Sequence, residues 1–460
     1  MDPTTSAPRD TWGSKLGFIL AAAGSAIGLG NIWGFPTVAG ANGGAAFLLV
    51  YLGCVAFIGA PVMLAELVVG RRTQRNPVGA FRALAPNSAW VIVGTLGVLT
   101  GIVILSFYSV IAGWTLSYTV KAAIGTFGSG TDTAAIFGDV AGSPLSAIGW
   151  HLVFMALTIY VVVGGVRDGI ERWTKVLMPL LVVLMLLLVA RAVTLSGAGA
   201  GLEFYFKPDF SKVTGSVVLA AIGQAFFSLS LGMGAMITYG SYVSKRDDLV
   251  SSAGWVTLFD TTVAIMAGLI IFPTLFHAGL QPGQGGPGMV FVVLTSLLGT
   301  IPPDPWGGIV FGTMFFLLLA IAALTSSVSL LEVVTSWAVD ERGMSRKRAA
   351  ITMGVVAFVV GVPSALASGA VSWLTAVPGV GMDFLSFLFT VFGQYSLVVG
   401  ALLISVFVGW VWGVEAAGEE VRANDGKFPL GAAWAFLIRF VCPIAIVGIL
   451  INLLRGLFGS

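Results

Sequence analysis

The sequence predicts an all-α polytopic membrane protein of about eleven transmembrane helices, and three observations support this fold class. Of the 460 residues, 57% are apolar and only 10% are charged, whereas a soluble protein has about 25% charged residues. The mean hydropathy is +0.98 over the whole chain, so apolar side chains must face lipid as well as a protein core. Apolar runs recur along the chain, and open sheet edges are excluded in lipid because their backbone groups would stay unpaired.

Eleven stretches are apolar enough and long enough to cross about 30 Å of hydrocarbon. These stretches are 14–38, 43–70, 89–124, 145–165, 169–195, 214–242, 251–277, 306–340, 345–368, 383–413 and 430–455. We interpret residues 1–460 as one domain, with a tail of residues 1–13 and no removable signal peptide. Residues 14–195 and 214–413 would form two five-helix repeats of inverted orientation, followed by helix 11 at 430–455.

The basic residues predict how the chain is oriented in the membrane. Alternate loops at 9–15, 71–82, 167–175, 245–246, 342–348 and 422–427 hold 17 of the 23 Lys and Arg residues. Because cytoplasmic loops are enriched in Lys and Arg, the N-terminus should be cytoplasmic and, after eleven spans, the C-terminus outside. A net charge of +2 on so apolar a chain offers no basic surface for nucleic acid. Cys54 and Cys442 both lie in apolar runs and are interpreted as packed thiols.

Two of the eleven stretches carry glycine clusters near their centres. They are GSAIGLGNIWGFP at 24–36 and SLSLGMGAM at 228–236. Each glycine costs up to about 1 kcal/mol relative to alanine in a helix, so broken first and sixth helices are expected. Close packing through small residues is the alternative for either cluster alone. The clusters occupy corresponding positions in the two halves and contain Asn31, Ser228 and Ser230, which indicates a binding site between inverted repeats.

The chain also resembles a known family. WGSKLGFILAAAGSAIGLGNIWGFP, then NGGAAFLLVYL and AELVVGRR, are similar to the opening of the neurotransmitter:sodium symporters. The similarity continues through QAFFSLSLGMGAMITYGSYV and ALTSSVSLLEVVTSWAVDE and covers nearly the whole chain. Bacterial amino-acid members, such as the leucine and tryptophan transporters, are the most similar, and many of them have eleven spans.

The resemblance implies two sodium sites and no organic cofactor. The first would use the side chains of Asn31, Ser228 and Asp260 with the carbonyl of Ala26, completed by the substrate carboxylate. The second would use the carbonyls of Gly24, Ile27 and Ala322 with the hydroxyls of Thr325 and Ser326. Hydroxyls bonded back to their own helix are the alternative for Thr325 and Ser326.

Asp260 also bears on chloride. A lone carboxylate within the membrane costs about 2.5 kcal/mol or more and indicates a functional position. Chloride-dependent relatives have Asn here and Ser one turn later, whereas this chain has Asp260 and Ala264. The fixed charge of Asp260 should therefore replace chloride.

For the substrate, the resemblance implies an α-amino acid. The amides of Leu29 and Gly30, with the Tyr108 hydroxyl, suit a carboxylate, since helix N-termini attract anions. Amine transporters of the family have Asp where this chain has Gly28, so a decarboxylated amine is not expected. The full set of expected substrate contacts is Ser25, Ala26, Gly28, Leu29, Gly30, Ile104, Tyr108, Phe227, Ser228, Ser230, Met233, Ser326 and Leu330. This mostly apolar set predicts a neutral, hydrophobic or aromatic amino acid.

Residues for gating and support follow from the same resemblance. Arg9 and Asp340 match the inner gate pair, with Trp12, Tyr242 and Glu332 nearby. At the outer gate the family usually has Arg where this chain has Gly34, so Asp383 lacks that partner. Closure would then depend more on Tyr108, Phe227 and water-mediated contacts. Glu66 is expected to accept hydrogen bonds from unwound backbone, and a proton relay is its alternative role.

The sequence thus predicts a sodium-coupled, chloride-independent amino-acid symporter of the inner or plasma membrane, not an enzyme, that works by alternating access. Its partners would be sodium, a small-molecule amino acid and the lipid bilayer. A proton-coupled amino-acid transporter of the same fold is one alternative. A substrate-gated channel or sensor is another. The identity of the amino acid, the ion stoichiometry and the oligomeric state stay open.

Overall fold

The chain folds into a bundle of helices, seen here in a computed structural model that describes residues 10–128, 130–283, 288–299, 301–302, 305–423 and 428–458. Within these residues every regular element is a helix and no strand occurs, so the predicted all-α fold class is confirmed. Up to Phe206 the elements are α1 (Lys15–Ala26), η1 (Gly30–Gly34), α2 (Phe35–Ala41), α3 (Ala45–Cys54), η2 (Val55–Gly59), α4 (Ala60–Thr73), α5 (Pro77–Leu84), α6 (Val91–Ala123), α7 (Thr133–Gly142), α8 (Pro144–Val163), η3 (Val166–Glu171), α9 (Arg172–Ala192) and α10 (Ala198–Phe206).

The rest of the chain continues the bundle. Its elements are η4 (Phe210–Lys212), α11 (Gly215–Ser228), α12 (Ala235–Gly240), α13 (Leu249–His277), η5 (Met289–Leu294), α14 (Thr295–Leu298), α15 (Trp306–Arg342), α16 (Arg346–Ala365), α17 (Ser372–Thr375), α18 (Phe384–Leu388), η6 (Phe389–Ser396), α19 (Leu397–Val406), η7 (Phe407–Val411), α20 (Val414–Val421), α21 (Gly431–Phe436), η9 (Leu437–Val441) and α22 (Cys442–Phe458). The η elements are π-helical segments, except for the 3-10 turn η4.

Length and composition identify most of the predicted spans. In the described part of the chain, nine helices are long and apolar enough to cross a membrane, and a tenth results if α1 and the helix Gly30–Ala41 are joined across their 53° bend. The predicted stretch 214–242 is present as α11 and α12, which are 14 and 6 residues long. Neither alone reaches the length of a span, so the predicted count of eleven is not confirmed. Both predicted breaks, in the first and sixth stretches, are confirmed.

Side-chain caps and glycines set several helix ends. Ser14 caps α1 by accepting a hydrogen bond from the Gly17 amide, and Asp248 caps α13 by accepting one from Ser251. Capping oxygens of this kind satisfy amides that have no partner within the helix. The long helix α15 ends where Gly343 takes a φ of +62°, a left-handed conformation that glycine adopts without strain.

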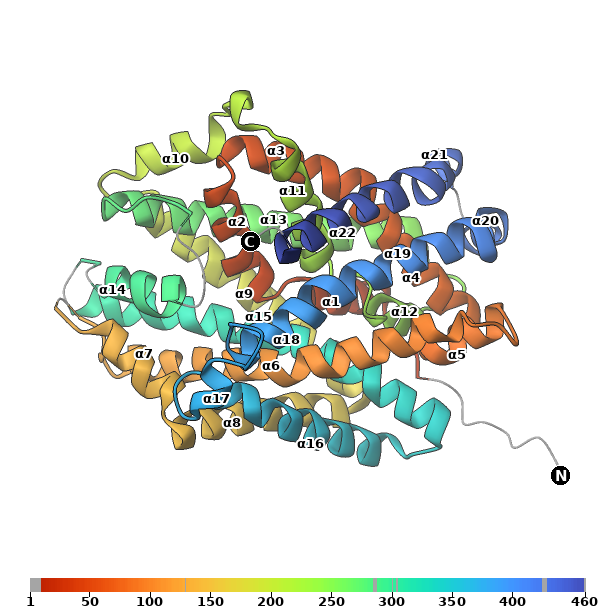
Figure 1. The fold of residues 1–460 in the computed structure, drawn as a ribbon, viewed down its shortest axis with the longest axis horizontal. Coiled ribbons are helices and arrows are strands. Elements are labelled where there is room, and N and C mark those ends of the chain that lie inside the picture. Colours follow the sequence, from red (N-terminus) through yellow and green to blue (C-terminus); the bar gives the residue numbers. More distant parts are fainter. Residues whose placement is uncertain are drawn as a thin grey trace.

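The two longest described helices, α6 and α15, pack against each other and against α8 and α16. All four lie mainly in the lower half of Figure 1. The broken helix α1 packs on α13 and α15, and α4 packs on α12. Large apolar side chains such as Val176, Val183, Leu186 and Leu187 remain exposed on α9. Such a surface suits lipid rather than water. The boundaries of the two predicted repeats stay a prediction.

Candidate functional site

The two helix breaks meet in the middle of the bundle. The Ser230 hydroxyl donates to the Ser25 carbonyl at 2.9 Å, which joins the segment after α11 to the end of α1. Between α11 and α12 the backbone takes positive φ at Ser230 (+54°), Gly232 (+87°) and Gly234 (+76°). A non-glycine residue in this region is uncommon, so Ser230 is held there by its surroundings.

Glu66 supports this unwound segment from α4. Its Oε1 accepts a hydrogen bond from the Gly232 amide at 2.7 Å, and the side chain is fully buried. A Cβ on Gly232 would lie 2.1 Å from the Leu397 carbonyl oxygen. Glycine is therefore required there for both its φ and its close contact. The structural role expected of Glu66 stays a prediction, and this hydrogen bond to unwound backbone is the observation in its favour.

A fully buried polar cluster lies beside the breaks and joins Asn31, Ser228 and Asp260. The Asn31 amide donates to Asp260 Oδ1 at 2.6 Å and to Ser228 Oγ at 2.8 Å, and Ser228 donates to Asp260 Oδ2 at 2.8 Å. The Tyr51 hydroxyl, which sequence reasoning did not single out, donates to Ser228 Oγ at 3.3 Å. Three side chains predicted for the first sodium site are thus brought together from η1, α11 and α13.

The donor atoms of this cluster suit a hard cation. The cluster contains amide, hydroxyl and carboxylate oxygens, which hydrogen bonds occupy in this structure, and Asn31 turns its side-chain nitrogen toward Ser228 and Asp260. The described residues contain no group of three or more His, Cys, Asp or Glu side chains placed to hold a metal ion. The Asn31 side-chain oxygen accepts a hydrogen bond from the Gly28 amide at 3.1 Å. Hard cations such as Ca²⁺ and Mg²⁺ prefer oxygen ligands, and Na⁺ shares that preference.

The residues predicted for the second sodium site also meet, where α15 crosses the end of α1. The Ser326 hydroxyl lies 3.1 Å from the Ile27 carbonyl oxygen and 3.4 Å from that of Gly24. Thr325 instead donates to the Ala322 carbonyl of its own helix at 3.0 Å. A Cβ on Gly24 would lie 3.1 Å from the Thr325 Cβ. Ser326 therefore contacts the chain at the end of α1. Thr325 instead bonds back to its own helix, which is the alternative that the sequence left open for this residue.

The expected carboxylate contacts lie at the start of η1. The Leu29 amide donates to the Tyr108 hydroxyl at 3.1 Å. A Cβ on Gly28 would lie 2.7 Å from Ser326 Oγ and 2.9 Å from the Tyr108 hydroxyl. A side chain at position 28 has no room unless these groups move, which excludes an aspartate in the present arrangement.

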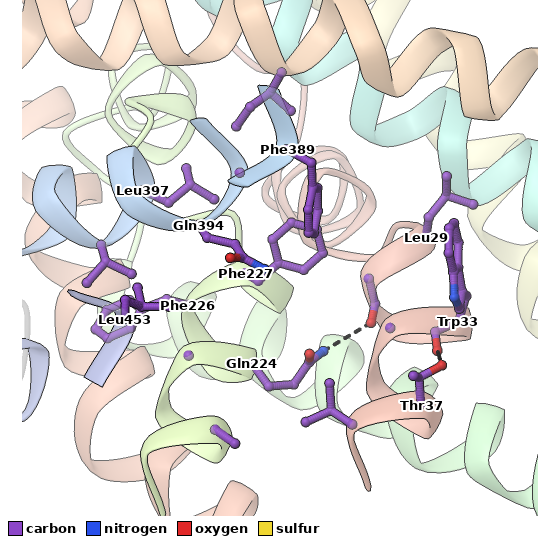
Figure 2. Close-up of a pocket in the computed structure, with 18 of the residues that line it drawn as sticks. Leu29, Trp33, Thr37, Gln224, Phe226, Phe227, Phe389, Gln394, Leu397 and Leu453 are labelled. Carbon is purple, nitrogen blue, oxygen red and sulfur yellow. Dashed lines mark hydrogen bonds between the residues drawn. The ribbon is translucent and has the colours of Figure 1, made fainter. Parts of the chain in front are cut away.

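A cavity of about 470 Å³ opens beside these groups, between η1, α11, η6 and α22. Figure 2 shows Leu29, Trp33 and Thr37 facing Phe227 and Gln394 across it. Its described lining carries no Asp, Glu, Lys, Arg or His side chain. The expected substrate residues that line the cavity are Leu29, Gly30, Ile104, Tyr108 and Phe227. Ser25, Ser230, Met233, Ser326 and Leu330 are buried, with at most 7% of each side chain exposed.

Gln224 is a further polar group of this cavity that the sequence did not indicate. Its side-chain amide donates to the Gly30 carbonyl at 3.0 Å, drawn as a dashed line in Figure 2. A Cβ on Gly34 would lie 4.0 Å from Gln224 Oε1. Glutamine in an apolar helix carries no positional signal by itself, because only the fold brings α11 next to η1.

Comparison with known proteins identifies the family. The model of the sodium:neurotransmitter symporter family matches residues 9–128 and 142–457. The chain belongs to this family. The family is one of transporters and not of enzymes, so the chain is a sodium-dependent transporter and a multi-pass membrane protein.

Relatives and a solved structure extend this assignment over the full length. The "Uncharacterized sodium-dependent transporter YhdH" of Bacillus subtilis is 40% identical over 96% of this chain and 97% of its own. An "Uncharacterized sodium-dependent transporter" of Haemophilus influenzae is 34% identical over 98% of this chain and 99% of its own. The crystal structure of MhsT in complex with L-phenylalanine is 46% identical, with a TM-score of 0.87 over 97% of this chain and 100% of MhsT.

Three residues expected near the inner gate, Trp12, Tyr242 and Glu332, meet Arg346, and we call these four residues the inner seam. The Tyr242 hydroxyl donates to Glu332 at 2.6 Å, and Arg346 binds both oxygens of that buried carboxylate at 3.0 and 2.6 Å. The Trp12 indole donates to the Tyr239 carbonyl at 3.1 Å. Arg346 was not predicted, since it stands 14 residues from Glu332 on the next helix.

The structure tests neither the predicted inner gate pair nor the predicted role of Asp383 at the outer gate. Arg9 lies outside the described residues. Asp340 accepts hydrogen bonds from the backbone N–H of Asn76 at 2.8 Å and from its side-chain nitrogen at 3.1 Å. Asp383 caps α18, where it accepts from the Ser386 amide at 2.9 Å and hydroxyl at 2.6 Å. The gating roles of Arg9, Asp340 and Asp383 therefore stay predictions.

Proposed function

We propose that this transporter couples the movement of a neutral, hydrophobic or aromatic α-amino acid to sodium, independently of chloride and by alternating access. The observation that carries the proposal is the buried cluster of Asn31, Ser228 and Asp260 next to the break at Gly28 and Leu29. The Gly28 amide donates to Asn31 of the cluster, and the Leu29 amide donates to the Tyr108 hydroxyl. Because the cluster and the break adjoin in this way, a substrate carboxylate that replaced the Tyr108 hydroxyl at Leu29 would lie beside a cation bound to Asp260. Binding of either ligand then favours binding of the other.

Two observations support a hydrophobic or aromatic side chain on the substrate: the lining of the cavity and the similarity to MhsT. The lining beside Phe227 and Ile104 is apolar and uncharged, so a charged amino-acid side chain would lose its hydration without gaining a partner. MhsT, which is similar over nearly the whole chain, was solved with L-phenylalanine. The obstructed space at Gly28 supports an amino acid over an amine.

A second sodium ion would lie between α1 and α15, near Ser326 and the carbonyls of Gly24 and Ile27. Asp260 would supply the fixed negative charge that makes chloride unnecessary, and the buried Ala264 offers no hydroxyl for an anion. The basic loops support a cytoplasmic N-terminus. The C-terminus would lie outside if all eleven predicted stretches cross.

The test is binding of phenylalanine to purified protein in sodium, in potassium and in sodium without chloride. We expect tight binding in sodium, with or without chloride, and a sharp loss in potassium. Asp260→Ala and Asn31→Ala should abolish the difference between sodium and potassium, whereas Asp383→Asn should retain it. Equal affinity in the two cations would refute sodium coupling, and a requirement for chloride would refute the role of Asp260. Stronger binding of tyramine than of tyrosine would refute the amino-acid preference.

A further inference from the structure

Away from the candidate site, one buried carboxylate gathers three cations from two separate segments. Glu420, on α20, is 3% exposed. Its Oε1 lies 2.9 Å from Arg71 Nε and 2.8 Å from Lys245 Nζ, and its Oε2 lies 3.5 Å from Arg72 Nη1. Arg71 and Arg72 belong to the last turn of α4, and Lys245 belongs to the loop after α12. We call Arg71, Arg72, Lys245 and Glu420 the α20 cluster.

Main-chain bonds strengthen the same junction. Arg71 is fully buried, and besides the Glu420 carboxylate it donates to the Glu420 carbonyl and, at 2.7 Å, to the Asp247 carbonyl. Gln74 donates to the Val243 carbonyl at 3.1 Å. The Arg71 guanidinium thus uses each of its three nitrogens to join α4, α20 and the loop after α12.

The helices α4 and α12 are themselves in backbone contact. A Cβ on Gly70 would lie 2.0 Å from the Ile237 carbonyl oxygen, and a Cβ on Gly240 would lie 2.6 Å from that of Leu67. Five residues before Arg71 on the same helix, Glu66 binds the Gly232 amide of the unwound segment. A shift of the segment between α11 and α12 would therefore carry α4 with it.

The α20 cluster differs from the inner seam in how easily it can separate. In the seam, Glu332 is fully buried but Arg346 is 21% exposed, so Arg346 can keep part of its hydration when α12 moves from α15 and α16. In the α20 cluster, the side chains of Arg71 and Glu420 are 1% and 2% exposed. If two such charges separate where water cannot reach them, each loses its counter-charge and gains no hydration, which is strongly unfavourable.

We propose that the α20 cluster is a permanent clamp, so that α20 moves with α4 and α12 as one body against α15 and α16 during transport. The loop between the tenth and eleventh predicted spans is then a moving part of the transporter, although it contributes no residue to the candidate site. Figure 1 shows α20 beside α4 at the right of the molecule, and the hydrogen bonds of Arg71 place them in contact. The inference rests on the proposed alternating access.

The experiment measures three spin-label distances in the full-length protein, with cysteines at the exposed positions Arg246, Lys347 and Glu419 and with Cys54 and Cys442 replaced by alanine. Arg246 reports the loop after α12, Glu419 reports α20, and Lys347 reports α16. Between potassium and sodium plus phenylalanine, the distances 246–347 and 419–347 should shift together, while 246–419 should stay constant. A change in 246–419, or a constant 419–347 beside a changed 246–347, would overturn the clamp.

Phenylalanine binding measured on the same samples separates the two proposals. No sodium-dependent binding would refute the proposed function, whatever the distances show. Normal binding with no change in any distance would refute the clamp as a moving body.

Variants then test the cause of the constant 246–419 distance. Glu420→Gln removes the charge that Arg71 faces. The double variant Arg71→Met/Glu420→Met removes both charges at similar volume, so it leaves neither charge of the pair buried and unpaired and should still fold if Glu420→Gln does not. Each should broaden the 246–419 distribution and leave phenylalanine affinity within twofold. Glu415→Gln, in the exposed pair with Arg439, is the matched control and should leave the distribution narrow. An unchanged 246–419 distribution in the double variant would show that the cluster does not hold α20.

Discussion

The cavity beside Phe227 and the inner seam beside Glu332 flank the candidate site and differ in charge. The described lining of the cavity has no charged side chain. Its elements contact one another through aromatic side chains and through the hydrogen bond from Gln224 to the Gly30 carbonyl. The seam is centred on a buried carboxylate bound by Arg346 and Tyr242. Closure of the cavity should therefore depend on many weak apolar contacts, whereas closure of the seam depends on a few buried charges. Single substitutions should have much larger effects at the seam.

The largest effect is expected from Glu332→Gln. This change removes a buried carboxylate and leaves Arg346, which is 21% exposed, without its counter-charge. Breaking a fully buried pair costs about 3–5 kcal/mol, and the partial hydration of Arg346 makes the cost lower here. The equilibrium should shift toward an open seam by up to roughly 100-fold, read from the distance between labels at Arg246 and Lys347. Asp10→Asn is the control, since Asp10 is half exposed where it meets Arg346 at 3.3 Å. A shift of similar size in Asp10→Asn would show that burial is not the cause.

At the cavity we expect a smaller effect from Phe227→Leu. The Phe227 ring packs edge-on against Phe389 at 5.9 Å and 78°, and an aromatic pair of this kind contributes about 1 kcal/mol beyond its burial. Phenylalanine affinity should fall about fivefold, and the loss should not depend on ionic strength. Phe387→Leu removes another aromatic pair, with Phe384 on α18, and should leave affinity unchanged. A loss that grows at low salt would contradict an apolar cause.

Gly34→Arg introduces charge into the uncharged cavity. The position has room, because the nearest atoms to an added Cβ are 4.0 Å away. If Asp383 is the predicted partner, the new pair should favour the closed cavity by about 1 kcal/mol, or roughly fivefold in population. Label distances across the cavity in sodium plus phenylalanine measure this. The double variant Gly34→Arg/Asp383→Asn should lose the gain, and a gain that persists would mean that Asp383 is not the partner.

The smallest effect is expected where charges are exposed. Arg82 and Glu341 form an ion pair at 2.6 Å, with Arg82 51% exposed. Such pairs contribute about 0.2–1 kcal/mol, so Arg82→Gln should change phenylalanine uptake and thermal stability little. If Arg82→Gln had an effect as large as that of Glu332→Gln, burial would not explain the difference between the inner seam and exposed ion pairs.

Much of the candidate site follows from sequence because its residues lie in motifs. Asn31, Ser228 and Asp260 were expected together from the resemblance, and the fold brings them into contact. Tyr51 and Gln224 were missed, because a single polar residue in an apolar helix has no periodicity that shows which way it faces. Arg71 and Glu420 were missed for another reason: they are 349 residues apart in the chain, and a pairing over that separation has no local signal.

The sequence by itself determined that this chain is helical, lies in a membrane and breaks its first and sixth helices. These properties depend on composition and on local backbone energetics, since lipid requires internal hydrogen bonds and clustered glycines weaken a helix wherever it packs. Only the tertiary structure decided which charges are buried together, as at Glu332 and Glu420. The strength of a charge pair depends on how far its surroundings exclude water, and that exclusion arises only when distant helices pack.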